Sequence, residues 1–304
     1  GYKTGFFAGA NDWDEFQMSG LIRPQLFDQY EAKPRDGIAS DRRAIELASA
    51  FLSRPDDSSG SQVVSEPRLA LVYLYGTHAT YQSYASDQLD QPAADNRFPF
   101  PYPARMRNSV WNRYRNSART IDRLLKPLLR RDRVVVTVGD HGEAFLEDGT
   151  VGHGTRLSRA QNMTAAVLYC PGKEAQVLDQ PTCHADVLPT LLSFLQVDVS
   201  DPRAIDGISL TNATEEQLRA RRFSVRNYLS QEYGLIGPWT KNSAKPFAYR
   251  FGASIIAEAV SPLNGIDEFG LESESQNIEE QTAEVTKWMS HFYRRGSGTP
   301  GKDE

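Results

Sequence analysis

The feature that most constrains the fold is a short, strongly apolar segment, Val134–Val138, followed at once by a polar motif. The segment reads VVVTV, and its β-branched residues form a run too short for an ordinary helix. This pattern is typical of a strand that is buried on both faces. The motif that follows, Gly139–Glu143 (GDHGE), places a carboxylate and an imidazole at the strand's carboxyl end. Because ligands bind beyond the carboxyl ends of strands in open α/β sheets, the motif predicts a functional edge.

Asp140 and His141 are residue types that bind metal ions. A carboxylate oxygen beside a neutral imidazole nitrogen suits zinc, manganese or a similar divalent ion. The alternative is that Asp140 caps a turn and His141 is an ordinary surface residue. A second histidine, His153, follows in a Gly-His-Gly triplet, whose glycines let the backbone pass close to a ligand. The preceding strand and this triplet favour the metal site.

Residue spacing predicts further elements of the core. Leu69–Tyr75 and Ala165–Tyr169 have the composition of buried strands, and the first would deliver His78 to the edge that carries Asp140. Asp41–Ser53 and Val110–Leu129 show helical spacing of apolar residues. The second helix also carries a row of arginines, which we interpret as a solvated face in preference to a surface for anionic membranes or acidic substrates. These arginines are Arg113, Arg115, Arg119, Arg123 and Arg130.

The segment Ser83–Arg107 contains prolines at positions 92, 99, 101 and 103, which exclude a regular helix or a central strand. We expect a long loop near the mouth of the site, where it either selects substrate or only packs. Further along, Asp186–Gln196 is expected to be helical, and Thr214–Gln217 (TEEQ) is a capping-box start. Cys170 and Cys183 fit either a disulfide or two buried thiols.

The sequence pattern changes near residue 220. Phe223–Leu229, Gly234–Ile236 and Phe247–Val260 alternate like antiparallel strands, and Ile278–Tyr293 has the spacing of an amphipathic helix. We therefore predict an α/β core over residues 1–220, with a mostly parallel central sheet flanked by helices. A small α+β subdomain, with an antiparallel sheet and a helix, is predicted to pack on it over residues 221–304.

Composition excludes several classes of protein. The 304 residues are 39% hydrophobic and 24% charged, enough for one large core with a small appendage. A net charge of -5 and a pI near 5.7 argue against a nucleic-acid partner. No apolar stretch approaches the roughly 20 residues that span a bilayer, and no signal peptide is visible. Because the chain begins in what resembles a strand, we expect it to be a fragment of a longer protein.

Five sequence blocks supplement the Asp-His motif. They are Gly1–Phe7 (GYKTGFF), Tyr75–Tyr81 (YGTHATY), Ser117–Asp122 (SARTID), His184–Leu192 (HADVLPTLL) and Asp206–Leu210 (DGISL). In this order they resemble the alkaline-phosphatase superfamily, in the branch that holds sulfatases, lipoteichoic-acid synthases and phosphoethanolamine transferases. The resemblance covers roughly residues 1–210. It implies the fold just predicted and a reaction at a sulfate or phosphate ester.

The resemblance also implies roles for individual residues. Asp140 and His141 would hold a divalent metal ion (Zn, Mn, Ca or Mg). His78 and His153 would be catalytic, holding nonbridging oxygens, assisting the leaving group or binding a second ion. For His78, the alternative is an ordinary solvated histidine. Glu143 receives no role beyond hydrogen bonding within its loop.

Two substrate-binding residues are suggested with their alternatives. Arg156 would steady the same ester oxygens or be an exposed loop arginine. Trp13 would match a head-group tryptophan of the lipoteichoic-acid synthases or be a packed loop aromatic. The arginine expected near Trp13 is replaced by Glu15, which argues against a glycerol-phosphate substrate.

The sequence thus predicts a sulfatase-family domain for the metal-dependent hydrolysis or transfer of a sulfate or phosphate ester. The alternatives are an envelope transferase of phosphoethanolamine or phosphoglycerol groups, and a catalytically silent domain that binds lipid or protein. The expected partner is a small anionic ester or a lipid head group, with the membrane reached through a missing N-terminal region. The resemblance places the domain in the periplasm, with its parent in the inner membrane. Because the family's nucleophile and another acidic ligand precede the first block, we expect this fragment to be inactive and to bind metal weakly or not at all.

Overall fold

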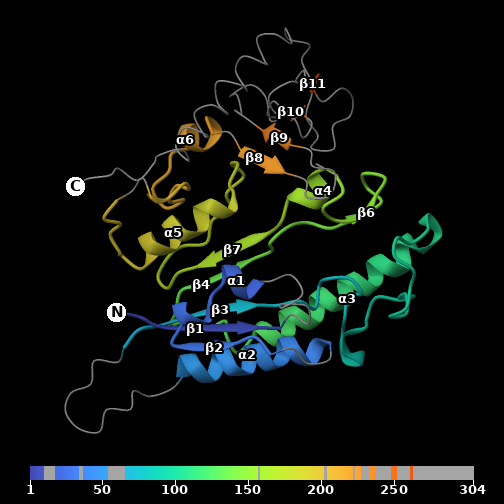
Figure 1. The fold of residues 1–304 in the computed structure, drawn as a ribbon, viewed down its shortest axis with the longest axis horizontal. Helices are drawn as coiled ribbons and strands as arrows, with labels where there is room; N and C mark the ends of the chain where they lie inside the picture. The colour runs from blue at the N-terminus through green and yellow to red at the C-terminus, as the bar shows by residue number, and fades with distance from the viewer. Residues whose placement is uncertain are drawn as a thin grey trace, which may run out of the picture. The chain divides into compact units, whose positions relative to one another are not determined.

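A computed structural model describes residues 1–9, 18–33, 37–53, 66–156, 158–201, 204–221, 223–226, 233–236, 248–251 and 261–262. These residues fall into two compact units, Gly1–Val135 and Val136–Glu304. Both units combine helices with strands (Figure 1), so the predicted α/β class is confirmed. The predicted boundary at residues 220 and 221 stays a prediction. None of the described helices is long and apolar enough to cross a membrane.

The first unit is built on a three-stranded parallel sheet. β1 (Lys3–Ala8) lies at its centre, between β2 (Gln29–Glu31) and β3 (Arg68–Tyr73). Successive side chains of a strand point to opposite faces of its sheet. Phe6 and Phe7, both fully buried, therefore belong to two separate apolar clusters.

Two long helices pack with Phe7. α2 (Ile38–Ser53) and α3 (Arg107–Leu125) contribute Phe51 and Leu124 to the larger apolar cluster. Both predicted helices are confirmed, although α3 begins and ends earlier than its apolar pattern suggested. The smaller cluster contains Phe6, which is partnered by side chains near α1 (Met18–Leu21), η1 (Pro24–Leu26) and β2; these are Met18, Ile22, Phe27 and Tyr30.

The proline-rich connection between β3 and α3 is a long loop, as predicted. Between residues 83 and 107 it contains only two single turns, η2 (Ala85–Asp87) and η3 (Ala104–Met106). Its aromatic side chains are partly buried with the unit: Phe98 is 7% exposed and Tyr102 is 4% exposed. Packing is therefore one role of this loop, while substrate selection by the loop stays a prediction.

The arginines of α3 require a correction to the sequence interpretation. Arg123 donates from Nε and Nη2 to the Asp87 carboxylate, at 2.9 and 2.8 Å. Arg115 and Arg119 lie 3.0 and 2.7 Å from the oxygens of Asp90. The row is therefore not simply a solvated face, because three of its five arginines bind carboxylates of the proline-rich loop. The carboxylates lie about 30 residues away in sequence, which helical spacing alone does not reveal.

In the second unit, the described strands before residue 220 form two separate two-stranded sheets. β4 (Val135–Val138) pairs with β7 (Ala166–Tyr169), so both predicted strands are confirmed. Val138 is 39% exposed, however, and the prediction that β4 is buried on both faces is wrong. The physical reason is that pairing with β7 satisfies an edge of β4 but covers neither face, and the consecutive residues Thr137 and Val138 are both exposed.

A short antiparallel pair and three helical segments complete this part. β5 (Ala144–Phe145) pairs with β6 (Val151–Gly152), and α4 (Arg159–Asn162) follows. The helix predicted at Asp186–Gln196 is present as η4 (His184–Asp186) and α5 (Val187–Phe194).

The predicted capping box is also confirmed. Thr214 caps α6 (Glu215–Arg219), with Thr214 and Gln217 exchanging hydrogen bonds at 2.9 and 3.2 Å. Cys170 and Cys183 are both free thiols, so the structure contains two half-buried thiols and no disulfide between them.

The small antiparallel sheet predicted near the C-terminus is present. Its strands are β8 (Phe223–Arg226), β9 (Tyr233–Ile236), β10 (Ala248–Phe251) and β11 (Ser261–Pro262), in the order β11-β10-β9-β8. All three described pairings are antiparallel. The helix predicted at Ile278–Tyr293 lies outside the described residues.

Candidate active site

The two predicted metal ligands directly follow β4. The backbone N–H of Gly139 donates to Ala165 O at 3.1 Å, so strand pairing fixes the chain up to the residue before Asp140. His141 Nδ1 lies 2.8 Å from Gly142 O. Because a carbonyl oxygen only accepts hydrogen bonds, Nδ1 carries the proton and Nε2 is the nitrogen that can bind a metal ion. His141 Nε2 lies 3.7 Å from Asp140 Oδ2.

This pair fits a divalent cation. Zinc binds imidazole nitrogen and carboxylate oxygen at about 2.0–2.2 Å, so two ligand atoms 3.7 Å apart can contact one ion. The side chains of His141 and Asp140 are 37% and 64% exposed, which leaves room for a substrate oxygen to approach. The charge and the donor types also agree with such an ion.

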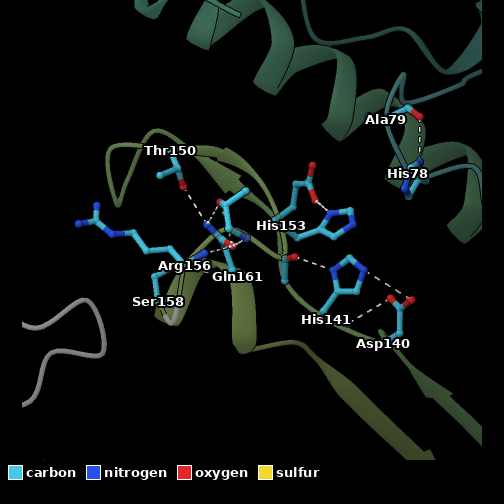
Figure 2. Close-up of polar contacts among 12 residues, drawn as sticks. His78, Ala79, Asp140, His141, Thr150, His153, Arg156, Ser158 and Gln161 are labelled. Carbon is cyan, nitrogen blue, oxygen red and sulfur yellow. Dashed lines mark hydrogen bonds and ion pairs between the residues drawn. The ribbon is translucent and has the colours of Figure 1, made fainter. Parts of the chain in front are cut away.

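His153 lies beside this pair and is held by a carboxylate. Its Nδ1 lies 2.7 Å from Glu143 Oε2, and its ring centroid is 3.9 Å from that of His141. Figure 2 shows the His141 and His153 imidazoles next to each other, with Asp140 beside His141. The hydrogen bond from His153 to Glu143 raises the pKa of the imidazole, although burial opposes this change. Ligand atoms of His141, Glu143 and His153 all lie within 4.8 Å of one another.

Glu143 is the residue whose part in the site the sequence analysis missed. The β5–β6 pair places Ala144 opposite Gly152, so the next residues outward, Glu143 and His153, also face each other. The signal was present in the sequence. An Asp-Gly dipeptide at positions 148 and 149 separates the two short segments, and this dipeptide is a strong hairpin indicator.

Arg156 lies on the other side of this loop from the imidazoles. Its Nη1 donates to the backbone oxygen of Asp148, and Figure 2 shows its guanidinium pointing away from His141 and His153. The structure therefore does not bring this guanidinium to the two rings. A substrate-binding role for Arg156 stays a prediction. Trp13 lies outside the described residues.

His78 belongs to the first unit and follows β3. Its Nδ1 lies 2.9 Å from Ala79 O, and its ring stacks on Tyr75 with 4.3 Å between centroids. As for His141, the carbonyl fixes the proton on Nδ1 and leaves Nε2 as the nitrogen for a substrate contact. Asp140, His141 and His153 lie in the second unit, so the convergence of His78 with them stays a prediction.

A buried carboxylate of α2 holds the segment that leads to His78. Asp41 is 1% exposed and accepts hydrogen bonds from the backbone N–H groups of Tyr75 and Gly76, at 2.9 and 2.6 Å. Burial raises the pKa of Asp41 to about 6, against the effect of these two hydrogen bonds. A Cβ at Gly76 would lie 2.7 Å from Asp41 Oδ2, so only glycine allows this close contact.

Comparison with known proteins assigns the family. The model of the Sulfatase family matches residues 1–197, which is more than half of the chain, and the chain therefore belongs to that family. The resemblance to the alkaline-phosphatase superfamily is thus confirmed. A search of curated proteins found no match.

Solved structures agree on the fold. A 2-O GAG sulfatase has a TM-score of 0.58 at 16% identity, covering 98% of this chain and 73% of that chain. A protein solved with its substrate, D-glucosamine-2-N,6-O-disulfate, also has a TM-score of 0.58, at 14% identity, covering 100% of this chain and 82% of that chain. The C-terminal periplasmic domain of EcEptC from Escherichia coli has a TM-score of 0.44 at 14% identity, covering 72% of this chain and 56% of that chain. That last similarity is too weak to bear on function.

Proposed function

We propose that this sulfatase-family domain binds a divalent metal ion through Asp140 and His141 and acts on a sulfate or phosphate ester. The observation that carries the proposal is the 3.7 Å separation of Asp140 Oδ2 and His141 Nε2, beside a histidine already oriented by a carboxylate. When bound, the ion would supply positive charge for the ester oxygens. The family assignment supports an ester hydrolase or transferase class.

The chain's own residues then have separate tasks. Glu143 holds the proton on His153 Nδ1, so that Nε2 is the nitrogen directed to a ligand. The raised pKa of His153 favours its cationic form, which can bind a nonbridging oxygen or give a proton to a leaving oxygen. His78, if it joins them, would contact the same ester through Nε2.

The substrate class is a small anionic ester. A sulfated sugar is favoured over a lipid head group because a protein of the same fold was solved with a disulfated glucosamine as its substrate. The transferase and the catalytically silent domain remain the alternative functions. We place the domain outside the cytoplasm, with its parent protein held at the inner membrane, on the basis of the family resemblance.

Calorimetry with zinc and manganese tests the metal site. We expect weak binding, near the limit of detection at high protein concentration, that falls by at least about tenfold in Asp140→Asn and in His141→Gln, because each replaces a strong ligand with an amide. Asp179→Asn, an exposed aspartate of the same unit, is the matched control and should bind like the unchanged protein. Equal binding by all four proteins would refute the site.

Anion titrations test the chemistry. Inorganic sulfate and phosphate, each added with zinc, should shift the imidazole signals of His141 and His153, and the tighter anion indicates the ester class. We expect no turnover of a nitrophenyl ester by the 304-residue chain, because we assign it no nucleophile. Ordinary turnover would overturn that assignment, while anion shifts without metal binding would favour a silent binding domain.

A further inference from the structure

The loop that carries His153 closes on one buried amide, the side chain of Gln161 in α4. Gln161 is 3% exposed. Its Oε1 accepts hydrogen bonds from the backbone N–H groups of Thr155 and Arg156, at 3.0 and 3.1 Å. Two successive peptide groups that closely follow His153 are therefore fixed by a single acceptor (Figure 2).

The other end of the same amide binds the β5–β6 hairpin. Gln161 Nε2 donates to Asp148 Oδ2 at 3.0 Å and to Thr150 Oγ1 at 2.8 Å. Burial of Asp148 opposes its ionisation, but hydrogen bonds from Ser158, Thr150 and Gln161 outweigh burial and lower its pKa. Asp148 is thus a charged acceptor at neutral pH, which strengthens its hydrogen bond to the amide.

The backbone of Gln161 reaches the other half of the site. Its carbonyl oxygen accepts a hydrogen bond from the N–H of Gly142 at 3.0 Å. Gly142 lies between His141 and Glu143, and a Cβ there would collide with the backbone oxygens of α4. This close approach of the two backbones explains why residue 142 is a glycine. It also means that one residue contacts both the His141–Glu143 segment and the loop that follows His153.

We propose that Gln161 is a positioning residue that sets the His153 imidazole against His141 and Glu143. Its amide is placed for this by the first turn of α4, where Ser158 accepts a hydrogen bond from the Gln161 N–H at 3.3 Å. The inference rests on the proposed function for the chemistry of the site. The position of the His153 ring, however, can be measured without any metal or ester. Gln161 touches neither reactant in this scheme and acts only through His153 and Gly142.

The test exchanges the donor and acceptor ends of one hydrogen bond. Gln161→Glu keeps the acceptor for Thr155 and Arg156 but sets a second carboxylate against Asp148. Adding Asp148→Asn returns a donor to this contact, so the double variant should restore the network. Gln161→Met keeps the packing volume without any polar end, and Arg159→Gln is the matched control on the exposed side of α4.

The main measurement is the nitrogen chemical shifts of the His141 and His153 rings, recorded without metal at one fixed pH. We expect Gln161→Glu and Gln161→Met to move these signals and the double variant to return them most of the way, with Arg159→Gln unchanged. Zinc affinity should fall by about 10- to 100-fold in the two single variants, as for other outer-sphere contacts, and recover in the double variant.

The outcomes separate this inference from the proposed function. If the unchanged protein binds no zinc but the ring signals still depend on Gln161, the metal proposal fails and the positioning role stands. If zinc binds and the ring nitrogen shifts of His141 and His153 are the same in both single variants as in the unchanged protein, the positioning role is overturned. Loss of the folded state in both single variants would also overturn it, because Gln161 would then act on the fold as a whole.

Discussion

Two histidine-bearing segments of this protein are held in different ways. The turn with His78 is fixed by one buried carboxylate, Asp41, which accepts two backbone N–H groups and has a raised pKa. The loop with His153 is fixed by several side chains that share hydrogen bonds around Gln161 and Asp148, and the pKa of Asp148 is lowered. The difference lies in burial: desolvation of Asp41 outweighs its two backbone hydrogen bonds, whereas the several donors around Asp148 outweigh its smaller desolvation.

The largest expected effect comes from removing the charged centre of the second segment. Asp148→Ala would leave four donors without this acceptor: the buried Ser158 hydroxyl, the backbone N–H and the hydroxyl of Thr150, and the Gln161 amide. At about 1 kcal/mol for each lost hydrogen bond, we expect the free energy of unfolding to fall by about 4 kcal/mol. Chemical denaturation measures this. A loss below about 1 kcal/mol would mean that water replaces the carboxylate without cost.

A pH titration of stability addresses the first segment. The pKa of Asp41 is raised from 3.8 to about 6 by burial, so the folded state binds an extra proton between these values. A raised pKa means that stability is fully present below the unfolded value and is lost as pH rises through the folded value. We expect the free energy of unfolding to fall by about 3 kcal/mol between pH 3 and 7, with about 2 kcal/mol of this loss between pH 4 and 6.

This pH window separates Asp41 from the other titrating groups. Carboxylates with lowered pKa values, such as Asp148 and Asp186, change stability at more acid pH, and His153 does so above about 6.5. Asp41→Asn should therefore remove most of the slope between pH 4 and 6. An equal slope in the variant would assign the effect to another group.

A smaller effect is expected from crowding the first segment. A Cβ at Gly76 would meet Asp41 Oδ2 at 2.7 Å and side-chain atoms of Ile38 and Ile121 at 2.6 and 2.9 Å. Overpacking of this kind costs about 2 kcal/mol, so Gly76→Ala should lower the thermal unfolding midpoint by several degrees. Gly20→Ala is the matched control, since no atom lies within 4 Å of its added Cβ and, like Gly76, it has no left-handed φ.

The smallest expected effect on stability concerns Glu143. Glu143→Gln removes the charge that, with its hydrogen bond, raises the pKa of His153, so this pKa should fall. Because the pKa of His153 is raised in the folded state, protonation of its ring stabilises the fold below about pH 6.5. This stabilisation is lost as the pH rises through the folded-state pKa. In Glu143→Gln, the free energy of unfolding should therefore fall less with rising pH than in the unchanged protein, and the difference between the two proteins should stay below about 1 kcal/mol. Histidine signals followed by nuclear magnetic resonance across pH would show it, and an unchanged pKa would contradict the pairing.

Much of the fold was predictable because its signals are local. The helices at Ile38–Ser53 and Arg107–Leu125 follow from apolar spacing, and the cap of α6 follows from the TEEQ pattern. The exposed carboxyl end of β4, Thr137 and Val138, was not predictable. Its β-branched composition describes what the strand tolerates, but burial depends on neighbours that composition does not specify.

In the candidate site, too, some residues could be found from the sequence and others only from the structure. Asp140, His141 and His153 were found from their residue types and from the glycines around them, although their roles remain proposals. Glu143 was undervalued because its importance arises only when the β5–β6 hairpin places it opposite His153. Arg156 was selected by its proximity in sequence to His153, whereas the loop turns its guanidinium toward the backbone of Asp148.

The sequence by itself determined which residue types the candidate site offers and much of the order of helices and strands, because both depend on residue type and on short-range periodicity. Only the tertiary structure decided which carboxylate holds which histidine, and that the amide of Gln161 joins two halves of one site. The physical reason is that hydrogen bonds require atoms within about 3 Å, and contacts between residues ten or more positions apart are created by folding.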